Sequence, residues 1–77
     1  ELNPRKNVEA LAASLGLTQR EAEVLLWVSH GKSSGDISEL LAISPRTVQK
    51  HLEHVYEKLG VETRSAAAAM AIRVIQQ

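Results

Sequence analysis

The chain has 77 residues, which is enough for one domain and too few for two. It has no cysteine, which excludes disulfides and thiolate metal sites, and no stretch approaching the ~20 apolar residues of a membrane span. Its nine Lys and Arg residues balance nine Asp and Glu residues, so the overall charge counts against a nucleic-acid binder.

The first part of the chain is expected to be a linker end followed by a short helix. Residues 1–6 are polar, carry a proline and lack the apolar run of a signal peptide. Asn7 can cap a helix that Gly16 ends. Apolar residues recur at helical spacing between them: Val8, Leu11, Ala12 and Leu15. The domain is therefore expected to span residues 7–77.

A second, longer helix begins at a capping box. The Thr18 hydroxyl can accept from the amide of Glu21, and the Glu21 carboxylate can reach back to the amide of Thr18. Gly31 ends this helix. A third helix of about two turns begins at Ser33, with Asp36 near its positive end. Its buried stripe is expected to be Ile37, Leu40 and Leu41.

The segment 42–44 breaks the chain before the most regular helix. Ser44 is a cap, and Pro45 stands at the first helical position, where its missing N–H matters least. A single apolar stripe follows before Gly60 ends the helix: Val48, Leu52, Val55, Tyr56 and Leu59. Thr63 can cap a last helix from Arg64 to about Ile75. The pattern predicts an all-α, four-helix helix-turn-helix domain with an extra short N-terminal helix.

The side of the 45–59 helix opposite its apolar stripe carries the residues that point to a function. With ~100° per residue, Lys50 and Glu53 fall within ~40° of Arg46 and Gln49 within ~60°. Gln can pair with adenine, Lys with guanine, and a carboxylate can accept from cytosine. The alternative is an ordinary solvated helix face, and the residues alone do not decide between the two.

Several spaced blocks of the sequence resemble the LuxR-type (GerE-like) helix-turn-helix DNA-binding domain, which is shared with the NarL-type response regulators. The matching blocks are LTQREAEVL at 17–25, GKS at 31–33, Ile37, ISPRTV at 43–48, His51-Leu52, YEKLGV at 56–61, Arg64 and Ala67. They cover most of the chain in the family's order and spacing. The resemblance implies a bacterial transcriptional regulator whose 45–59 helix reads the major groove of double-stranded DNA.

The resemblance also implies roles for individual residues. The base-contacting positions are Gln49, Lys50 and Glu53. The positions at or near the DNA backbone are Lys32, Ser34, Ser44, Arg46, Thr47, Lys58 and Arg64. A homodimer on DNA would form through the last helix, at Ala66, Ala69, Met70 and Arg73. An upstream sensory or receiver domain and RNA polymerase are the further partners it implies, in the cytoplasm.

The chain departs from the family pattern at three places. Ser34-Gly35 stands where the family often has Asn-Lys, and Gln49-Lys50 stands where it often has Lys-Asn. Base preference therefore need not match that of better-known members. Ala42 stands where the family often has Gly; if that backbone is left-handed, alanine destabilises the fold by roughly 1 kcal/mol.

Other chemistry finds little support in the sequence. His51 and His54 are three apart on one helix, but no third ligand lies near in sequence, so no metal and no cofactor are expected. Trp27 is expected in the core or against an upstream domain. No nucleophile set or phosphate-binding loop is present, so no enzyme activity is expected. The alternatives to a DNA-binding output domain are a helical protein-interaction module and the promoter-reading domain of a sigma factor.

Overall fold

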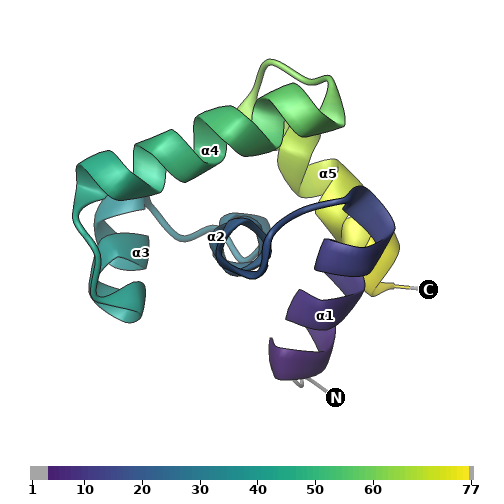
Figure 1. The fold of residues 1–77 in the computed structure, drawn as a ribbon, viewed down its shortest axis with the longest axis horizontal. Coiled ribbons are helices and arrows are strands. Elements are labelled where there is room, and N and C mark those ends of the chain that lie inside the picture. Colours follow the sequence, from purple (N-terminus) through teal and green to yellow (C-terminus); the bar gives the residue numbers. More distant parts are fainter. Residues whose placement is uncertain (1–3, 77) are drawn as a thin grey trace.

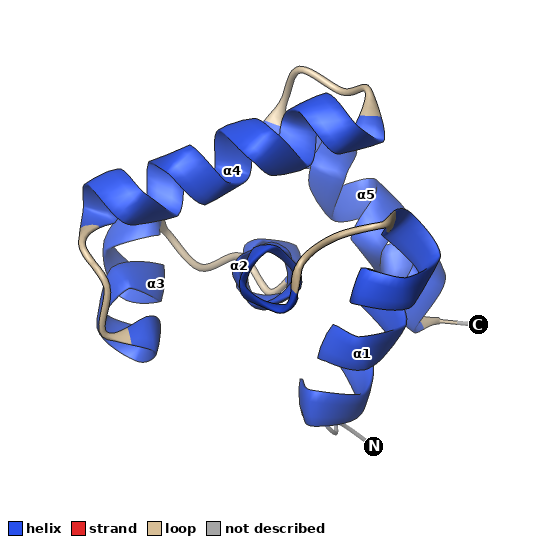
Figure 2. Ribbon diagram, in the orientation of Figure 1, coloured by secondary structure: helices blue, strands red, loops and turns tan. Residues whose placement is uncertain are grey.

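The computed structural model describes residues 4–76, which form five helices and no strand (Figures 1 and 2). The helices are α1 (Pro4–Leu15), α2 (Gln19–Ser29), α3 (Ser34–Leu41), α4 (Pro45–Leu59) and α5 (Arg64–Ile75). The predicted all-α fold is confirmed. Within this range no helix is long and apolar enough to cross a membrane.

Four of these helices begin at the caps that the sequence predicts. Thr18 and Glu21 form a complete capping box at the start of α2, with N–H···O distances of 3.0 and 3.1 Å. Ser33 and Asp36 form a second one at α3. Ser44 accepts the amide of Thr47 at α4, and Thr63 accepts the amide of Ala66 at α5. Each cap satisfies a helix N–H that has no partner in the first turn.

The first helix is longer than expected at its start. It begins at Pro4, so Asn7 lies inside the helix and is not its cap. The expected linker end overlaps this helix at residues 4–6, and residues 1–3 lie outside the described residues. Proline is favoured at the first helical position because its fixed φ suits the helix. Pro4 suits this position, and the expected cap at Asn7 is not used.

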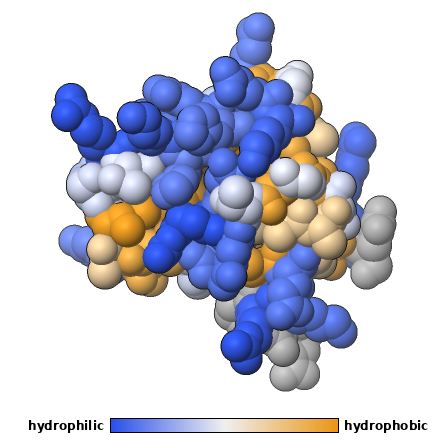
Figure 3. All heavy atoms as spheres, in the orientation of Figure 1, coloured by the Kyte–Doolittle hydropathy of each residue, from blue (hydrophilic) through white to orange (hydrophobic). Residues whose placement is uncertain are grey.

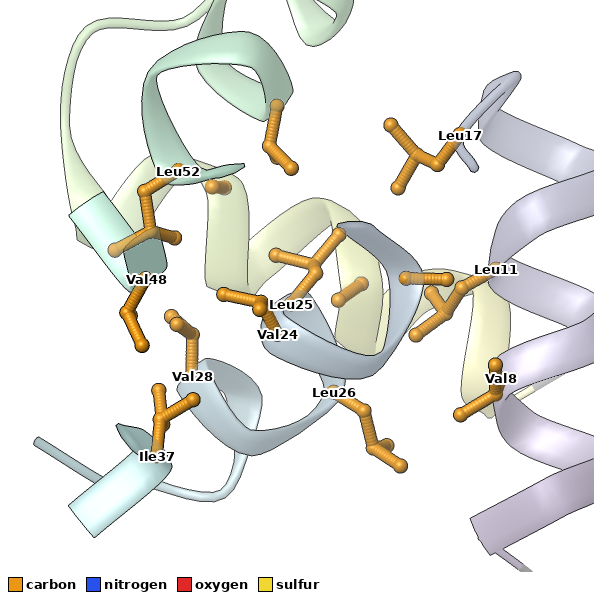
Figure 4. Close-up of a cluster of buried hydrophobic side chains, with 14 residues drawn as sticks. Val8, Leu11, Leu17, Val24, Leu25, Leu26, Val28, Ile37, Val48 and Leu52 are labelled. Atoms are coloured by element: carbon orange, nitrogen blue, oxygen red, sulfur yellow. The ribbon is translucent and has the colours of Figure 1, made fainter. Parts of the chain in front are cut away.

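The core is built around α2, which Figure 1 shows end-on between the other helices. The α2 side chains of Val24, Leu25 and Leu26 are at most 1% exposed. Figure 4 shows side chains from α1, α3 and α4 directed toward α2, among them Leu11, Ile37, Val48 and Leu52. Aliphatic residues supply nearly all of this core. Because α2 is buried on most of its surface, it fixes the positions of the helices around it.

The helix α3 buries a narrower stripe than predicted. Ile37 is fully buried and Leu41 is half-buried, but Leu40 is 51% exposed, so the prediction that Leu40 belongs to the core is wrong. With only two turns, α3 meets the core along one edge, and its contacts are mainly with α4. Ser38, rather than Leu40, is the further residue of α3 that is buried.

The break between α3 and α4 is a single left-handed residue. Ala42 has φ 57° and ψ 43°, and it is the only non-glycine residue with positive φ in the described range. Its amide donates to the carbonyl of Ser38, which ends α3. An alanine here carries a strain of roughly 1–2 kcal/mol. The sequence left open whether the backbone at residue 42 is left-handed, and the structure shows that it is.

Candidate nucleic-acid interface

The outer side of α4 is open and polar. Gln49, Lys50 and Glu53 are all exposed, and none of their side chains has a hydrogen-bond or ion-pair partner within the described part of the chain. In Figure 3 the hydrophilic surface runs along the upper edge of the molecule, where Figure 1 places α4. These three side chains are therefore free to contact a ligand without first breaking a contact within the fold.

The inner side of α4 is packed against the rest of the domain. Val48, Leu52 and Val55 are at most 1% exposed and belong to the core cluster (Figure 4). Burying such side chains contributes about 1.5–3 kcal/mol each. Aliphatic packing thus holds one side of α4 against the core and leaves its polar side facing outward, as the helical periodicity predicts.

The first turn of α4 combines a rigid cap with one free cation. The Ser44 hydroxyl accepts the amide of Thr47 at 3.1 Å and lies 2.9 Å from the Thr47 hydroxyl. Arg46, between them, is exposed, and no hydrogen bond or ion pair holds its guanidinium within the described residues. Ser44 and Thr47 therefore shape the helix start, while Arg46 is the residue here that can reach an anion.

Arg64, at the start of α5, bridges to the start of α3. Its guanidinium donates to the carbonyl of Lys32 at 2.9 Å and to the hydroxyl of Ser34 at 3.4 Å. These bonds join the α2–α3 connection to α5. The Lys32 ammonium is not engaged by this bridge, because Lys32 contributes only its backbone carbonyl.

The far end of α4 is tied to the start of α2 through a buried carboxylate. The Lys58 Nζ lies 2.8 Å from Glu21 Oε1, and the His54 Nδ1 lies 3.6 Å from Glu21 Oε2. Glu21 is only 4% exposed. Burial by itself would raise the pKa of Glu21, but the hydrogen bonds from Lys58 and Thr18 and the charge of Lys58 outweigh it. The pKa of Glu21 is therefore held below its ordinary value of 4.5.

The outer face of α5 carries a mixed surface of small and apolar side chains. Ala67 and Ala71 point inward and are fully buried. Ala69, Ile72 and Arg73 are exposed, whereas Ala66 and Met70 are half-buried. Ile72 is one of the two large hydrophobic residues exposed in the described range. The four residues that the sequence assigns to a dimer contact therefore all keep some exposure.

Trp27 and the three histidines lie in different surroundings. Trp27 is half-buried against the core, meets the His30 ring edge to face and lines an open groove of about 770 Å³ between α1 and α2. No group of three or more His, Cys, Asp or Glu side chains gathers around a metal position in the described residues. His51 is half-buried on α4, whereas His54 is exposed and faces Glu21.

Sequence reasoning did not find the contact between Glu21 and Lys58. The capping box accounts for one oxygen of Glu21, and nothing in the local pattern assigns its further partners. Lys58 and Glu21 are 37 residues apart, so only the packing of α4 on α2 brings them together. The same holds for the bridge from Arg64 to Lys32, which spans 32 residues.

Comparisons with known proteins agree with this geometry. A family model for bacterial regulatory proteins of the luxR family matches residues 15–71, which leaves nearly all of α1 outside the match. No solved structure matches the chain.

Among curated proteins, the chain is 48% identical over 60 residues to the transcriptional activator protein BjaR1 of Bradyrhizobium diazoefficiens, covering 78% of this chain and 25% of that protein. It is 38% identical over 66 residues to the transcriptional activator protein AnoR of Acinetobacter nosocomialis, covering 86% and 28%. It is 46% identical over 56 residues to the transcriptional activator protein AhyR of Aeromonas hydrophila, covering 73% and 22%. The chain therefore spans between 22 and 28% of the length of these relatives.

The family model matches most of the chain, and the structure is a helix-turn-helix fold with a free polar face on α4. This chain therefore belongs to the luxR family of bacterial regulatory proteins and is a DNA-binding domain of that family.

Proposed function

We propose that α4 enters the major groove and that Gln49, Lys50 and Glu53 read base edges there. The observation that carries the proposal is that these three side chains are exposed and unpartnered on the side of α4 opposite its buried stripe. Gln can form two hydrogen bonds with adenine, Lys can donate to guanine, and Glu can accept from cytosine N4. A carboxylate on this face suits base reading better than phosphate binding, because phosphates repel it.

The contacts to the DNA backbone come from α4 and from the connection that precedes α3. Arg46 on α4 and Lys32 in the α2–α3 connection have exposed side chains that can neutralise phosphates. The resemblance gives backbone positions to five other residues that already take part in hydrogen bonds or ion pairs of the fold: Ser34, Ser44, Thr47, Lys58 and Arg64. The Ser44 and Thr47 hydroxyls bond to each other, and a hydroxyl has capacity for more than one hydrogen bond.

A dimer on DNA would pair two copies through α5. Ala66 and the exposed Ala69 are small enough to let two helices approach closely. The exposed Ile72 and the half-buried Met70 add apolar surface, and Arg73 is exposed on the same helix. Two copies related by a two-fold axis would place two α4 helices in successive major grooves about 34 Å apart, which is one turn of DNA. The operator is therefore expected to consist of two inverted half-sites.

The whole protein would couple this domain to a signal. The relatives named above are several times longer than the chain and are called transcriptional activators. We propose that a sensory or receiver domain precedes this C-terminal output domain and that RNA polymerase is a partner at the promoter. The domain acts by binding rather than by catalysis, in the cytoplasm.

The experiment that tests this function is the selection of bound sites from random DNA duplexes. We expect an enriched inverted repeat that the protein binds about 10³-fold or more tightly than random duplex. Binding without an enriched sequence would contradict base reading. No binding to duplex DNA in low salt would favour a module that contacts only proteins.

The α5 interface can be tested separately with Ala69→Glu. A charge on each copy would face its counterpart across the two-fold axis, so cooperative binding to paired half-sites should fall while binding to an isolated half-site stays the same. Electrophoretic mobility shifts on one-site and two-site duplexes measure both quantities. Ala13→Glu, at an exposed position on α1, adds the same charge outside α5 and is the control. Unaltered cooperativity in Ala69→Glu would place the dimer contact elsewhere.

A further inference from the structure

The contact between α2 and α4 combines apolar packing with one buried polar connection. Glu21 accepts a hydrogen bond from the amide of Thr18 at 3.0 Å and from Lys58 Nζ at 2.8 Å. His54 approaches its second oxygen at 3.6 Å. Glu21 is the single buried carboxylate of the described residues. The start of α2 and the last turns of α4 are thus joined at one point.

Apolar packing alone would leave the orientation of α4 loosely determined. The contacts of Val48, Leu52 and Val55 with the core are non-directional, so a small roll or slide of the helix would cost little. An ion pair with a 2.8 Å hydrogen bond is directional and is strengthened by partial burial. It therefore restricts motions that the apolar contacts permit.

The position of Lys58 on the helix suits this restraint. At ~100° per residue, Lys58 lies ~80° around α4 from Lys50 and ~12 Å farther along its axis. It stands on the flank between the outer face and the core, so its contact opposes a roll of α4 about its own axis. A roll of only ~10–20° is enough to misplace side chains that must meet base edges.

The electrostatics favour keeping Lys58 on Glu21 when DNA is bound. Moving the ammonium to a phosphate would leave the buried Glu21 carboxylate without its cation, which is unfavourable even though the Lys58 side chain is 40% exposed. Arg46 can bind a phosphate without breaking an ion pair, because its exposed guanidinium has no partner in the described residues. Arg46 and Lys58, near opposite ends of α4, are therefore suited to different tasks.

We propose that Glu21 and Lys58 form a strut that sets the orientation of α4, so that both act on DNA recognition as positioning residues although neither contacts DNA. The proposal rests on the proposed function of α4 and revises one part of it, since the family resemblance places Lys58 among the backbone contacts. The proposal gives Glu21 a role in DNA specificity, although Glu21 belongs to α2, which would lie outside the groove.

The substitution Glu21→Gln separates the strut from a phosphate contact, because the two roles predict opposite changes. Gln keeps an acceptor for the Thr18 amide but loses the charge that holds Lys58. If the strut acts as proposed, affinity for the selected site falls by roughly two- to thirtyfold, the range for residues that act on a site without touching its ligand. The dependence of log K on log[salt] stays the same. If Lys58 binds phosphate, its release raises affinity and steepens this dependence, which would overturn the proposal.

Two substitutions on α4 serve as comparison for the salt dependence. Lys58→Met should weaken binding without changing the slope, whereas Arg46→Ala should make the slope less steep by about 0.9, the value for one lost phosphate contact. Lys58→Arg can still reach Glu21 and should restore affinity. A slope change in Lys58→Met equal to that in Arg46→Ala would overturn the strut. All variants are assayed at a temperature where circular dichroism shows them fully folded, so that a loss of stability alone does not change the affinity.

A measurement without DNA distinguishes failure of the strut from failure of the proposed function. A double-mutant cycle of Glu21→Gln and Lys58→Met on the free energy of unfolding should show a favourable coupling between the two residues. Strictly additive losses would overturn the strut even if the domain binds DNA as proposed. Coupling in a protein that selects no duplex would instead refute base reading by α4 and leave the strut in place.

Discussion

The two ends of α4 differ in what their polar side chains contact. Near its start, Arg46, Gln49 and Lys50 are exposed and have no partner within the described residues. Near its end, Lys58 and His54 meet the buried carboxylate of Glu21. The same helix therefore has a free end and a tied end, and the tie lies at the end farther from the residues proposed to read bases.

The connections before and after α4 differ in a parallel way. Both turns need one left-handed residue: Ala42 before the helix, with φ 57°, and Gly60 after it, with φ 70°. Glycine adopts this conformation without a steric penalty, whereas alanine does not. The free end of α4 thus follows a strained turn, and the tied end precedes a relaxed one. The ion pair and the strained turn therefore lie at opposite ends of α4.

The largest effect should come from the free end. We expect Lys50→Ala to weaken binding to the selected site by about 1–3 kcal/mol, because it removes a hydrogen-bond donor to a base edge, while binding to random duplex changes little. Fluorescence anisotropy on both duplexes measures the difference. Glu57→Ala, on the same side of α4 but outside the proposed reading set, is the matched control. An equal loss on both duplexes would make Lys50 a backbone contact.

The two turns should respond to substitution in opposite directions. Ala42→Gly relieves the left-handed strain and should stabilise the domain by about 0.5–1 kcal/mol, and Gly60→Ala should destabilise it by about 1 kcal/mol. A Cβ at Gly60 meets nothing within 4 Å, so conformational strain rather than a clash would cause the loss. Each kcal/mol moves Tm by roughly 4–8 °C in a domain of this size. Thermal unfolding followed by circular dichroism tests both, and a lower Tm for Ala42→Gly would show that the alanine side chain makes a stabilising contact.

The smallest effect should be a pH dependence at the tied end. The folded pKa of Glu21 lies below its ordinary value of 4.5, so its ion pair contributes stability above that pH and loses it as the pH falls through the folded pKa. The difference in unfolding free energy between the natural chain and Glu21→Gln should therefore be constant near neutral pH and shrink in the acid range. Urea unfolding between about pH 7 and pH 3 measures it. If the difference in unfolding free energy stays constant down to pH 3, the charge of Glu21 does not stabilise the folded state.

Local sequence determined most of the helix boundaries and the side of α4 that is exposed. Four N-terminal caps, at Thr18, Ser33, Ser44 and Thr63, are made between residues three apart, and such contacts form in any fold that contains the helix. The apolar stripe of α4 has the helical period, so the opposite side had to face outward. The sequence leaves open whether Ala42 is left-handed, and the structure shows that it is.

Tertiary structure decided the features that depend on which helices meet. Leu40 has the right spacing for the core, but α3 is too short to cover it, and it stays exposed. The partners of Glu21, Lys58 and Arg64 lie 30 or more residues away, where no periodicity or motif can pair them. Hydrogen bonds between residues three apart can be predicted from the local sequence. The orientation of α4 cannot, because it depends on how the side chains of several helices pack in the core beneath it.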